Sequence, residues 1–236
     1  MDMAWAALPV LFPEVAGPGR WLPLLQRHAA LIEAAVGRVR VTSVPAREAI
    51  QRQYAESLEL LRIVRRSTLA IPILADVGSG GGFPGLVAAI ACPETAVHLV
   101  EPLQKRAALL RELSEALALE NVTVHPVRAE EAGRGSLRDG ASVVTARAVA
   151  GLRELLEYTA PLAAPGGLIA LPKGSAFGEE LADAANAAKV LACGFLAFEA
   201  MRPAVSATLG VALFRKLGPT PAAYPRRPGV PGKRPL

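Results

Sequence analysis

The fold of this chain is decided by the stretch Asp76-Val77-Gly78-Ser79-Gly80-Gly81-Gly82-Phe83-Pro84-Gly85. An apolar run at 69–75 leads into it, and an apolar, helix-like run at 86–91 leads out of it. The glycines therefore lie where a strand turns into a helix. Glycine permits a positive φ and lets a ligand approach without meeting a Cβ, while the start of a helix offers free N–H groups. We expect a nucleotide-like ligand to bind here.

The sequence from residue 69 onward alternates short β-rich runs with helical runs. Such alternation predicts an α/β domain with a mostly parallel sheet and helices on both faces. The last two β-rich runs have no room for a helix between them, which predicts an antiparallel strand at the edge. The expected strands are 71–77, 96–101, 122–127, 142–146, 167–172, 195–201 and 208–215, and the expected helices are 84–92, 102–118, 152–163 and 177–193.

The N-terminal region has a different, helical pattern. Residues 1–19 are rich in Pro and Ala and are expected to be irregular. Apolar residues recur at helical spacing from Trp21 to Val36, and a second helix is expected from Ser43 toward Arg66. The sequence thus predicts three parts, namely a helical extension at 1–68, an α/β domain at 69–218 and a basic tail at 219–236.

The net charge of +5 is unevenly distributed along the chain. Seven basic residues and no acidic one follow position 201, which leaves 19 basic against 21 acidic side chains in the rest. This asymmetry favours contact between the C-terminal end and a polyanion, with nucleic acid as the first choice and a solvated tail as the alternative. The stretch 224–236 is rich in Pro and Gly as well, so we expect it to be extended and mobile unless it is bound.

The composition excludes several other classes of protein. Cys92 and Cys193 lie far apart without the spacing of a metal site, which indicates a reducing compartment. The three histidines do not cluster in the sequence either, and we expect no metal. No uncharged run is long enough to span a membrane, and no basic segment precedes the apolar run at 3–13. The expected location is the cytoplasm.

Two cofactor classes fit the glycine loop. Glu101 follows the second expected strand, where an acidic side chain accepts hydrogen bonds from ribose hydroxyls or complements the dipole of the next helix. The run 80–85 matches the dinucleotide pattern G-x-G-x-x-G, which favours NAD or FAD. Pro84, however, removes an N–H that a pyrophosphate would use, and Asp76 would repel a diphosphate but suits a cationic sulfonium. We therefore favour S-adenosylmethionine over a nicotinamide cofactor.

Several motifs along the chain together resemble those of a known family. The loop at 76–85 is followed by Glu101 with Lys105-Arg106, and by motifs at 127–131, 145–148 and 171–174. In this order the chain is similar to the RsmG (GidB) family of bacterial ribosomal RNA methyltransferases, in register from about residue 42 to 216. The resemblance implies a Rossmann-like class I methyltransferase fold with seven strands. It also implies methyl transfer from S-adenosylmethionine to N7 of a guanine in the 530-loop region of 16S rRNA, within the 30S subunit or an assembly intermediate.

The resemblance also implies roles for single residues. Gly78 and Phe83 match loop positions that line the cofactor, and Glu101 matches the acidic partner of its ribose. Asp76, which suits a sulfonium, is expected beside the cofactor as well. Ala129 and Glu130 match a pair beside the adenine, and Arg147 matches an arginine beside the cofactor. Arg128 and Lys173 are the expected substrate contacts, and Arg128, Arg147 and Lys173 together form the expected catalytic set. The glycines expected at the cofactor are Gly78, Gly80 and Gly82.

One departure from the family lies in the N-terminal region. The family commonly has Arg-His-x-x-Asp-Ser where this chain has Arg52-Gln53-Tyr54-Ala55-Glu56-Ser57. The missing histidine makes an essential role for that position doubtful here. Guanine N7 carries a lone pair and no proton, so the expected chemistry needs orientation and no general base. A nicotinamide oxidoreductase, or a ribosome-binding protein without activity, are the alternative functions.

Overall fold

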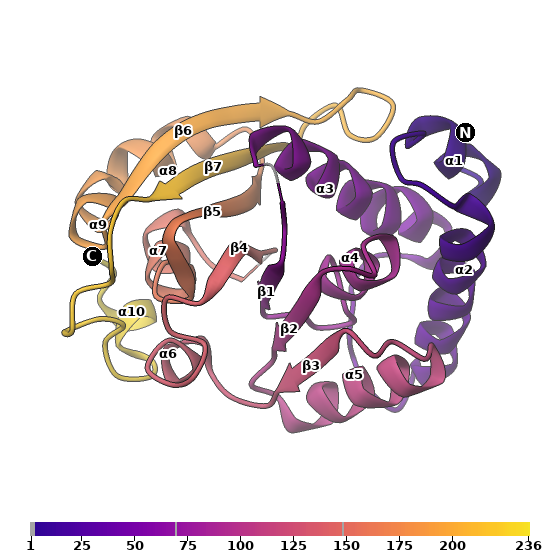
Figure 1. Cartoon of the computed structure of the whole chain (residues 1–236), viewed down its shortest axis with the longest axis horizontal. Helices are drawn as coiled ribbons and strands as arrows, with labels where there is room; N and C mark the ends of the chain where they lie inside the picture. The colour runs from indigo at the N-terminus through magenta and orange to yellow at the C-terminus, as the bar shows by residue number, and fades with distance from the viewer. Residues whose placement is uncertain (1–2, 69, 148) are drawn as a thin grey trace.

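The computed structural model describes residues 3–68, 70–147 and 149–236. Its centre is a seven-stranded sheet in the order β3-β2-β1-β4-β5-β7-β6 (Figure 1). Each strand overlaps one of the runs expected from the sequence. The strands are β1 (Ile73–Val77), β2 (Ala96–Val100), β3 (Val122–His125), β4 (Ala141–Ala146), β5 (Ala163–Lys173), β6 (Cys193–Ala200) and β7 (Gly210–Lys216).

The first five strands are parallel to one another. Strand β7 is antiparallel to both β5 and β6, so the expected antiparallel strand lies one place in from the edge and β6 closes the sheet outside it. The chain builds β2 and β3 on one side of β1 and β4 on the other. The strand order therefore reverses between β1 and β4, and ligands of open α/β sheets bind at the carboxyl ends of the strands beside such a point.

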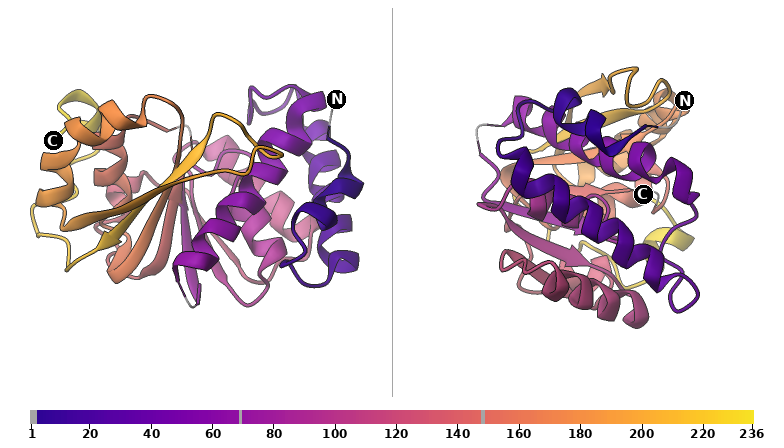
Figure 2. Two further views of the ribbon diagram at one scale, coloured as in Figure 1. Left: turned by 90° about the horizontal axis from the view of Figure 1, so that it is seen from above. Right: turned by 90° about the vertical axis from the view of Figure 1, so that its right-hand side faces the viewer.

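Helices cover both faces of the sheet (Figure 2). Neighbouring strand residues point to opposite faces, and accordingly Val143 belongs to one hydrophobic core and Val144 to the other. The first core lies under α2 (Pro18–Ala35), α3 (Glu56–Ser67), α4 (Gly85–Ala91) and α5 (Gln104–Ala116). The second lies under α6 (Ala129–Ala132), α7 (Leu152–Thr159), α8 (Phe177–Asp183) and α9 (Ala185–Val190).

The N-terminal region shares the first core with the sheet. Tyr54 and Leu58 are buried in the same cluster as Leu74 and Val143 of the strands. The stretch expected to be irregular contains η1 (Trp5–Ala7) and α1 (Leu8–Leu11). The second expected helix is divided into η2 (Ala46–Glu48), a π-helical turn η3 (Ile50–Ala55) and α3. Similarly, the helix expected at 177–193 divides at Ala184 into α8 and α9.

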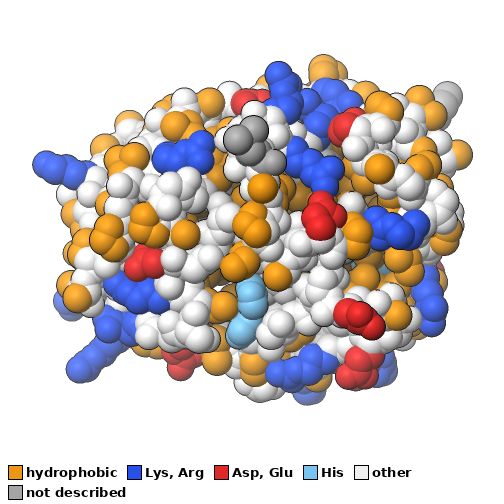
Figure 3. Space-filling view, in the orientation of Figure 1, with side chains coloured by type: hydrophobic (Ala, Val, Ile, Leu, Met, Phe, Trp, Pro, Cys, Tyr) orange, Lys and Arg blue, Asp and Glu red, His pale blue; other side chains and the backbone are white. Residues whose placement is uncertain are grey.

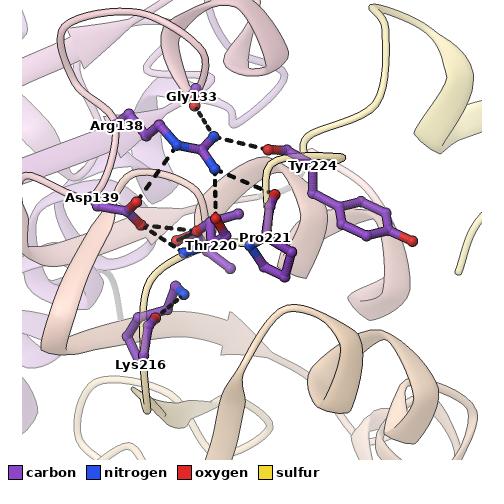
Figure 4. A network of polar contacts seen from close by, with 9 residues as sticks. Gly133, Arg138, Asp139, Lys216, Thr220, Pro221 and Tyr224 are labelled. Atoms are coloured by element: carbon purple, nitrogen blue, oxygen red, sulfur yellow. Dashed lines mark hydrogen bonds and ion pairs between the residues drawn. The ribbon is translucent and has the colours of Figure 1, made fainter.

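The expectation that the C-terminal tail is extended is wrong, because the tail folds back onto the second face of the sheet. It contains the short helix α10 (Val230–Lys233), which lies beside α7 (Figure 1). The guanidinium of Arg138 donates to the carbonyl oxygens of Thr220 at 2.6 Å and Tyr224 at 2.8 Å (Figure 4). Asp139 accepts from the hydroxyl of Thr220 at 2.9 Å. These bonds fix the start of the tail.

Two buried carboxylates hold the rest of the tail. Glu157 has no exposed side-chain surface, and its oxygens accept from Nε of Arg226 at 2.9 and 3.1 Å and from the second guanidinium nitrogen at 2.5 Å. Glu130 accepts from the backbone N–H of Gly229 at 2.8 Å. A proline-rich and glycine-rich composition predicts little about such anchoring, since the partners lie about 70 to 100 residues away in the sequence.

None of the described helices has the combination of length and apolar character that crossing a membrane requires.

Candidate active site

A cavity of about 1120 Å³ lies at the carboxyl ends of the strands. The glycine loop forms one side of it, and residues after β4 and β5 form another. The remaining walls come from the segment 40–56 of the N-terminal region and from the loop 205–209 between β6 and β7. The cavity is therefore closed by parts of the chain that are far apart in sequence.

The glycine loop is shaped from behind by Asp76. Gly78, Gly80 and Gly82 have positive φ angles of 73°, 56° and 91°. The carboxylate of Asp76 accepts from the backbone N–H of Gly85 at 3.1 Å, and a Cβ on Gly85 would come within 2.7 Å of that oxygen. Pro84 has no N–H and that of Gly85 is already engaged, so the start of α4 offers little to a phosphate.

Asp76 is completely buried and does not line the cavity. Burial raises the pKa of its carboxyl group to about 6, although the bond from Gly85 opposes this shift. Within the described residues its second oxygen has no hydrogen-bond partner, and neither has the hydroxyl of Thr145, which is paired with Asp76 in the register of β1 and β4. Buried polar atoms in proteins are nearly always hydrogen-bonded, to water or ligand if not to protein. The two orphaned atoms therefore mark the ends of β1 and β4 as a place for a polar partner.

Glu101 connects the glycine loop to the end of β2. It is 2% exposed, and its two oxygens accept from the backbone N–H groups of Gly80 at 2.9 Å and Leu103 at 3.0 Å. Both roles expected for Glu101 are compatible with this position. It binds a backbone donor just before α5, as a residue that complements the helix dipole would, and it lies against the glycine loop, as a ribose-binding residue would. It is not among the residues that line the cavity.

The residues expected beside the adenine lie at the start of α6. Ala129 and Glu130 are buried, and the carboxylate of Glu130 is directed to Gly229 of the tail. Arg128 is exposed, and its backbone N–H donates to Glu131 at 2.8 Å. None of these three lines the cavity.

Arg147 and Glu56 form an ion pair in the cavity wall. Their nearest atoms are 3.6 Å apart, and Arg147 also donates to the backbone oxygen of Arg52 at 2.8 Å and lies 5.6 Å from the ring centre of Phe83. Burial lowers the pKa of Arg147, while Glu56 and Asp76 oppose this shift. Burial raises the pKa of Glu56 to about 7, although Arg147 and Arg52 favour its charged form.

Lys173 lines the cavity at the end of β5 and is 8% exposed. Its ammonium group donates to Glu180 of α8 at 2.6 Å, and Glu180 also accepts from the backbone N–H of Leu152 at 2.9 Å. The lysine therefore links β5 to the starts of α7 and α8 in this structure.

The N-terminal region supports the glycine loop from the other side, through a histidine to which the sequence analysis gave no role at the site. The buried ring of His28 lies 3.0 Å from the carbonyl oxygen of Gly81 through Nε2 and 3.1 Å from the hydroxyl of Tyr54 through Nδ1. Gln53, which replaces the family's usual histidine, donates to the hydroxyl of Thr42 at 2.7 Å. In the sequence, His28 lies among apolar residues at helical spacing. This pattern is equally typical of a histidine that only packs in the core.

Comparisons with known proteins show the family to which the chain belongs. The model of the GidB family, described as rRNA small subunit methyltransferase G, matches residues 22–203. The chain belongs to this family. It is 40% identical over 220 residues to the ribosomal RNA small subunit methyltransferase G of Roseiflexus castenholzii, with 92% of each chain covered. It is 39% identical to the protein of that name from Chloroflexus aggregans, with 84% of this chain and 83% of the relative covered.

Solved structures show the fold at lower identity. A SAM dependent methyltransferase from Aquifex aeolicus is 10% identical, with a TM-score of 0.54 over 80% of this chain and 98% of that one. The cofactor-bound Rv0187 from MTB is 18% identical, with a TM-score of 0.52 over 83% and 90% of the two chains. The predicted Rossmann-like methyltransferase fold is thereby confirmed.

Membership of the methyltransferase G family makes the chain an S-adenosylmethionine-dependent methyltransferase, which confirms the predicted enzyme class and cofactor. The nicotinamide alternative is excluded. Of the expected site residues, the structure brings Gly78, Gly80, Phe83, Arg147 and Lys173 to one cavity. Six others are not among the residues that line it, namely Asp76, Gly82, Glu101, Arg128, Ala129 and Glu130.

Proposed function

We propose that this protein transfers a methyl group from S-adenosylmethionine to N7 of a guanine in the 530-loop region of 16S rRNA. The observation that carries the proposal is the cavity of about 1120 Å³, which joins the glycine loop to Arg147 and Lys173. Pockets for one small ligand have volumes of about 300–1,000 Å³. The cavity thus has room for a cofactor beside the loop and for a nucleobase in front of it.

The residues present suit a cofactor with cationic groups and no phosphate. Few backbone donors are free at the start of α4, and the carboxylates of Asp76 and Glu101 lie directly behind the loop. Gly78, Gly80, Phe83 and Arg147 would hold the cofactor from the cavity side. Once bound, the cofactor supplies an electrophilic methyl group, and the N7 lone pair forms the new bond as the C–S electron pair returns to sulfur.

The protein's own contribution is orientation and exclusion of water. N7 has no proton to lose, so no side chain has to act as a base. Holding the two reactants in line is worth up to about 7–11 kcal/mol in well-oriented systems. Methylation leaves a positive charge on the purine, so Arg147 is better placed on the cofactor carboxylate or the cavity wall. Lys173, which lines the cavity, would contact guanine O6 or a neighbouring phosphate, and the exposed Arg128, outside the cavity lining, would contact a phosphate only.

The RNA backbone requires exposed basic groups around the cavity. On the face shown in Figure 3, Lys and Arg side chains lie in separate groups among apolar and acidic ones. The cavity itself is lined by Arg40, Arg52 and Arg106. We assign the phosphate contacts to these three in preference to the tail, because the tail packs against α7 and its Arg226 is paired with Glu157. A 16S rRNA substrate, free or in a subunit, implies a cytoplasmic location.

The test is transfer of a tritiated methyl group to unmodified 30S subunits, to assembly intermediates and to free 16S rRNA. The modified base is then mapped by strand cleavage at N7-methylguanine. We expect one modified guanine in the 530-loop region. Methylation at another base would contradict the proposal, and cofactor binding without transfer to any of the three substrates would favour the inactive ribosome-binding alternative.

A further inference from the structure

The carboxyl group of Glu56 is largely buried in the cavity wall and accepts no hydrogen bond from the part of the chain that the structure describes. Glu56 is the first residue of α3, its side chain is 10% exposed, and it lines the cavity. No described residue donates a hydrogen bond to it, and its nearest charged partner is Arg147 at 3.6 Å. Burying an ionisable group without hydrogen bonds is unfavourable. A carboxylate in this position is therefore matched to donors that arrive with a ligand.

The neighbouring arginine does not satisfy these oxygens. Arg147 directs its close hydrogen bond to the backbone oxygen of Arg52 at 2.8 Å and lies over the ring of Phe83. It lowers the electrostatic cost of the Glu56 carboxylate but leaves its lone pairs free. Glu56 therefore keeps the capacity to accept two parallel N–H groups, as carboxylates do in bidentate pairs.

We propose that Glu56 reads the target guanine by accepting hydrogen bonds from N1–H and from the exocyclic amino group of its Watson–Crick edge. This inference rests on the proposed function. Of the four RNA bases only guanine presents two adjacent donors on that edge. N7 lies on the opposite side of the purine, so a base held in this way keeps N7 free to face the cofactor. Enzymes that act on a single base commonly read its Watson–Crick edge in a pocket.

The same contact would favour the reaction itself. Methylation at N7 makes the purine cationic, which makes N1–H and the amino group stronger donors. Their bonds to a carboxylate therefore become stronger in the transition state than in the ground state, and only such interactions accelerate the chemical step. A guanidinium in contact with the base would have the opposite effect. Glu56 would give the base a negative partner, while the guanidinium of Arg147 is engaged with the backbone oxygen of Arg52 and with Glu56 itself.

The experiment compares single-turnover methyl transfer to 30S subunits that carry either guanine or inosine at the target position. Inosine lacks only the exocyclic amino group. For the wild-type chain we expect inosine to lower the rate by roughly 10- to 100-fold, the range of one good bidentate contact. For Glu56→Gln we expect a similar loss with guanine and less than about a threefold further loss with inosine, because the contact is already gone. Glu56→Asp should be slower than wild type but should retain the preference for guanine.

Three further measurements separate the possible outcomes. Glu112 is an exposed residue of α5 whose carboxylate is paired with Arg38. Glu112→Gln should therefore behave as wild type in every assay. Calorimetric titration with S-adenosylhomocysteine should give the same Kd for Glu56→Gln and wild type within about twofold. A Kd that rises in parallel with the loss of rate would make Glu56 a cofactor ligand and would overturn the inference. An equal inosine effect in wild type and Glu56→Gln would overturn it as well, whereas a wild type that methylates no RNA refutes the proposed function itself.

Discussion

Nε2 of His28 lies 3.0 Å from the carbonyl oxygen of Gly81, so helix α2 is bonded directly to the glycine loop. A carbonyl oxygen only accepts, so Nε2 carries the proton, and Nδ1 accepts from the hydroxyl of Tyr54 at 3.1 Å. Phe83 of the loop lies against both rings, with its ring centre 5.1 Å from each. The loop is thus held from behind by a buried polar chain set in an aromatic cluster.

The first prediction concerns the effect of the Tyr54–His28–Gly81 hydrogen bonds on cofactor affinity. His28→Ala removes the donor to Gly81 and leaves a cavity among Tyr54 and Phe83, so the loop should lose its fixed conformation. We expect the Kd for S-adenosylhomocysteine to rise about tenfold, corresponding to one buried hydrogen bond and its packing. Tyr54→Phe is the matched control, because it keeps Nε2 bonded to Gly81 and should change the Kd little. A His28→Ala protein with lower thermal stability but an unchanged Kd would limit His28 to the core.

The second prediction concerns acid stability. Burial lowers the pKa of His28 to about 4 from its usual 6.5. The unfolded chain therefore takes up a proton first, and the stability contributed by neutral His28 is lost as the pH falls from about 6.5 to 4. The loss is on the order of 3 kcal/mol for a shift of this size. Urea denaturation at pH 7.5 and pH 5 should show a smaller pH effect in His28→Phe than in wild type, and an equal effect would contradict the assignment.

The third prediction concerns the tail. Arg226→Ala leaves Glu157 buried without its bidentate partner, and removing one member of a buried pair is destabilising by about 3–5 kcal/mol. The double variant with Glu157→Gln should recover much of this loss, since no unpaired charge then remains. Arg227→Ala is the control, because that side chain is exposed. Denaturant unfolding measures all three, and equal stability of the two arginine variants would contradict the anchoring role.

The class of fold and the location of the cavity at the carboxyl ends of the strands could be predicted from the sequence, because both are indicated by local patterns. Alternating β and helical runs specify a parallel sheet, and the glycines after β1 mark its switch point. Family motifs placed Arg147 and Lys173 after successive strands, and both line the cavity. These features need only the order of residues along a single strand and its following loop.

The remaining wall of the site could not be predicted, since it depends on contacts over long sequence separations. Glu56 meets Arg147 across 91 positions and His28 meets Gly81 across 53, and no periodicity signals either pairing. The folded state of the tail could not be predicted either, because composition and charge counts do not show buried partners such as Glu157. An acidic residue at position 56, where the family commonly has Asp, was the one available signal for that part of the wall.

The fourth prediction concerns salt dependence of RNA binding. Each phosphate contact that is lost should reduce the slope of log K against log salt by about 0.7–0.9. Alanine at Arg40 and at Arg52 should therefore each lower affinity for 16S rRNA and flatten this slope. Alanine at Lys233 and Arg234, exposed residues of the tail, should leave the slope nearly unchanged. Filter binding at salt concentrations from about 50 to about 300 mM measures these slopes. The reverse ranking would restore the tail as the RNA contact.

The fifth prediction is that the substrate-reading carboxylate lowers the stability of the free protein. The pKa of Glu56 is raised to about 7 from 4.5, so folding favours its neutral form. Stability from this group is complete below pH 4.5 and is lost as the pH rises to about 7. Glu56→Gln should therefore match wild type at pH 4.5 and be more stable at pH 8 by about 1–3 kcal/mol, a range lowered for partial solvent screening. Denaturation at the two pH values measures the difference. A glutamine variant that is less stable at pH 8 would show that Glu56 forms stabilising bonds in the folded protein and is not held ready for a ligand.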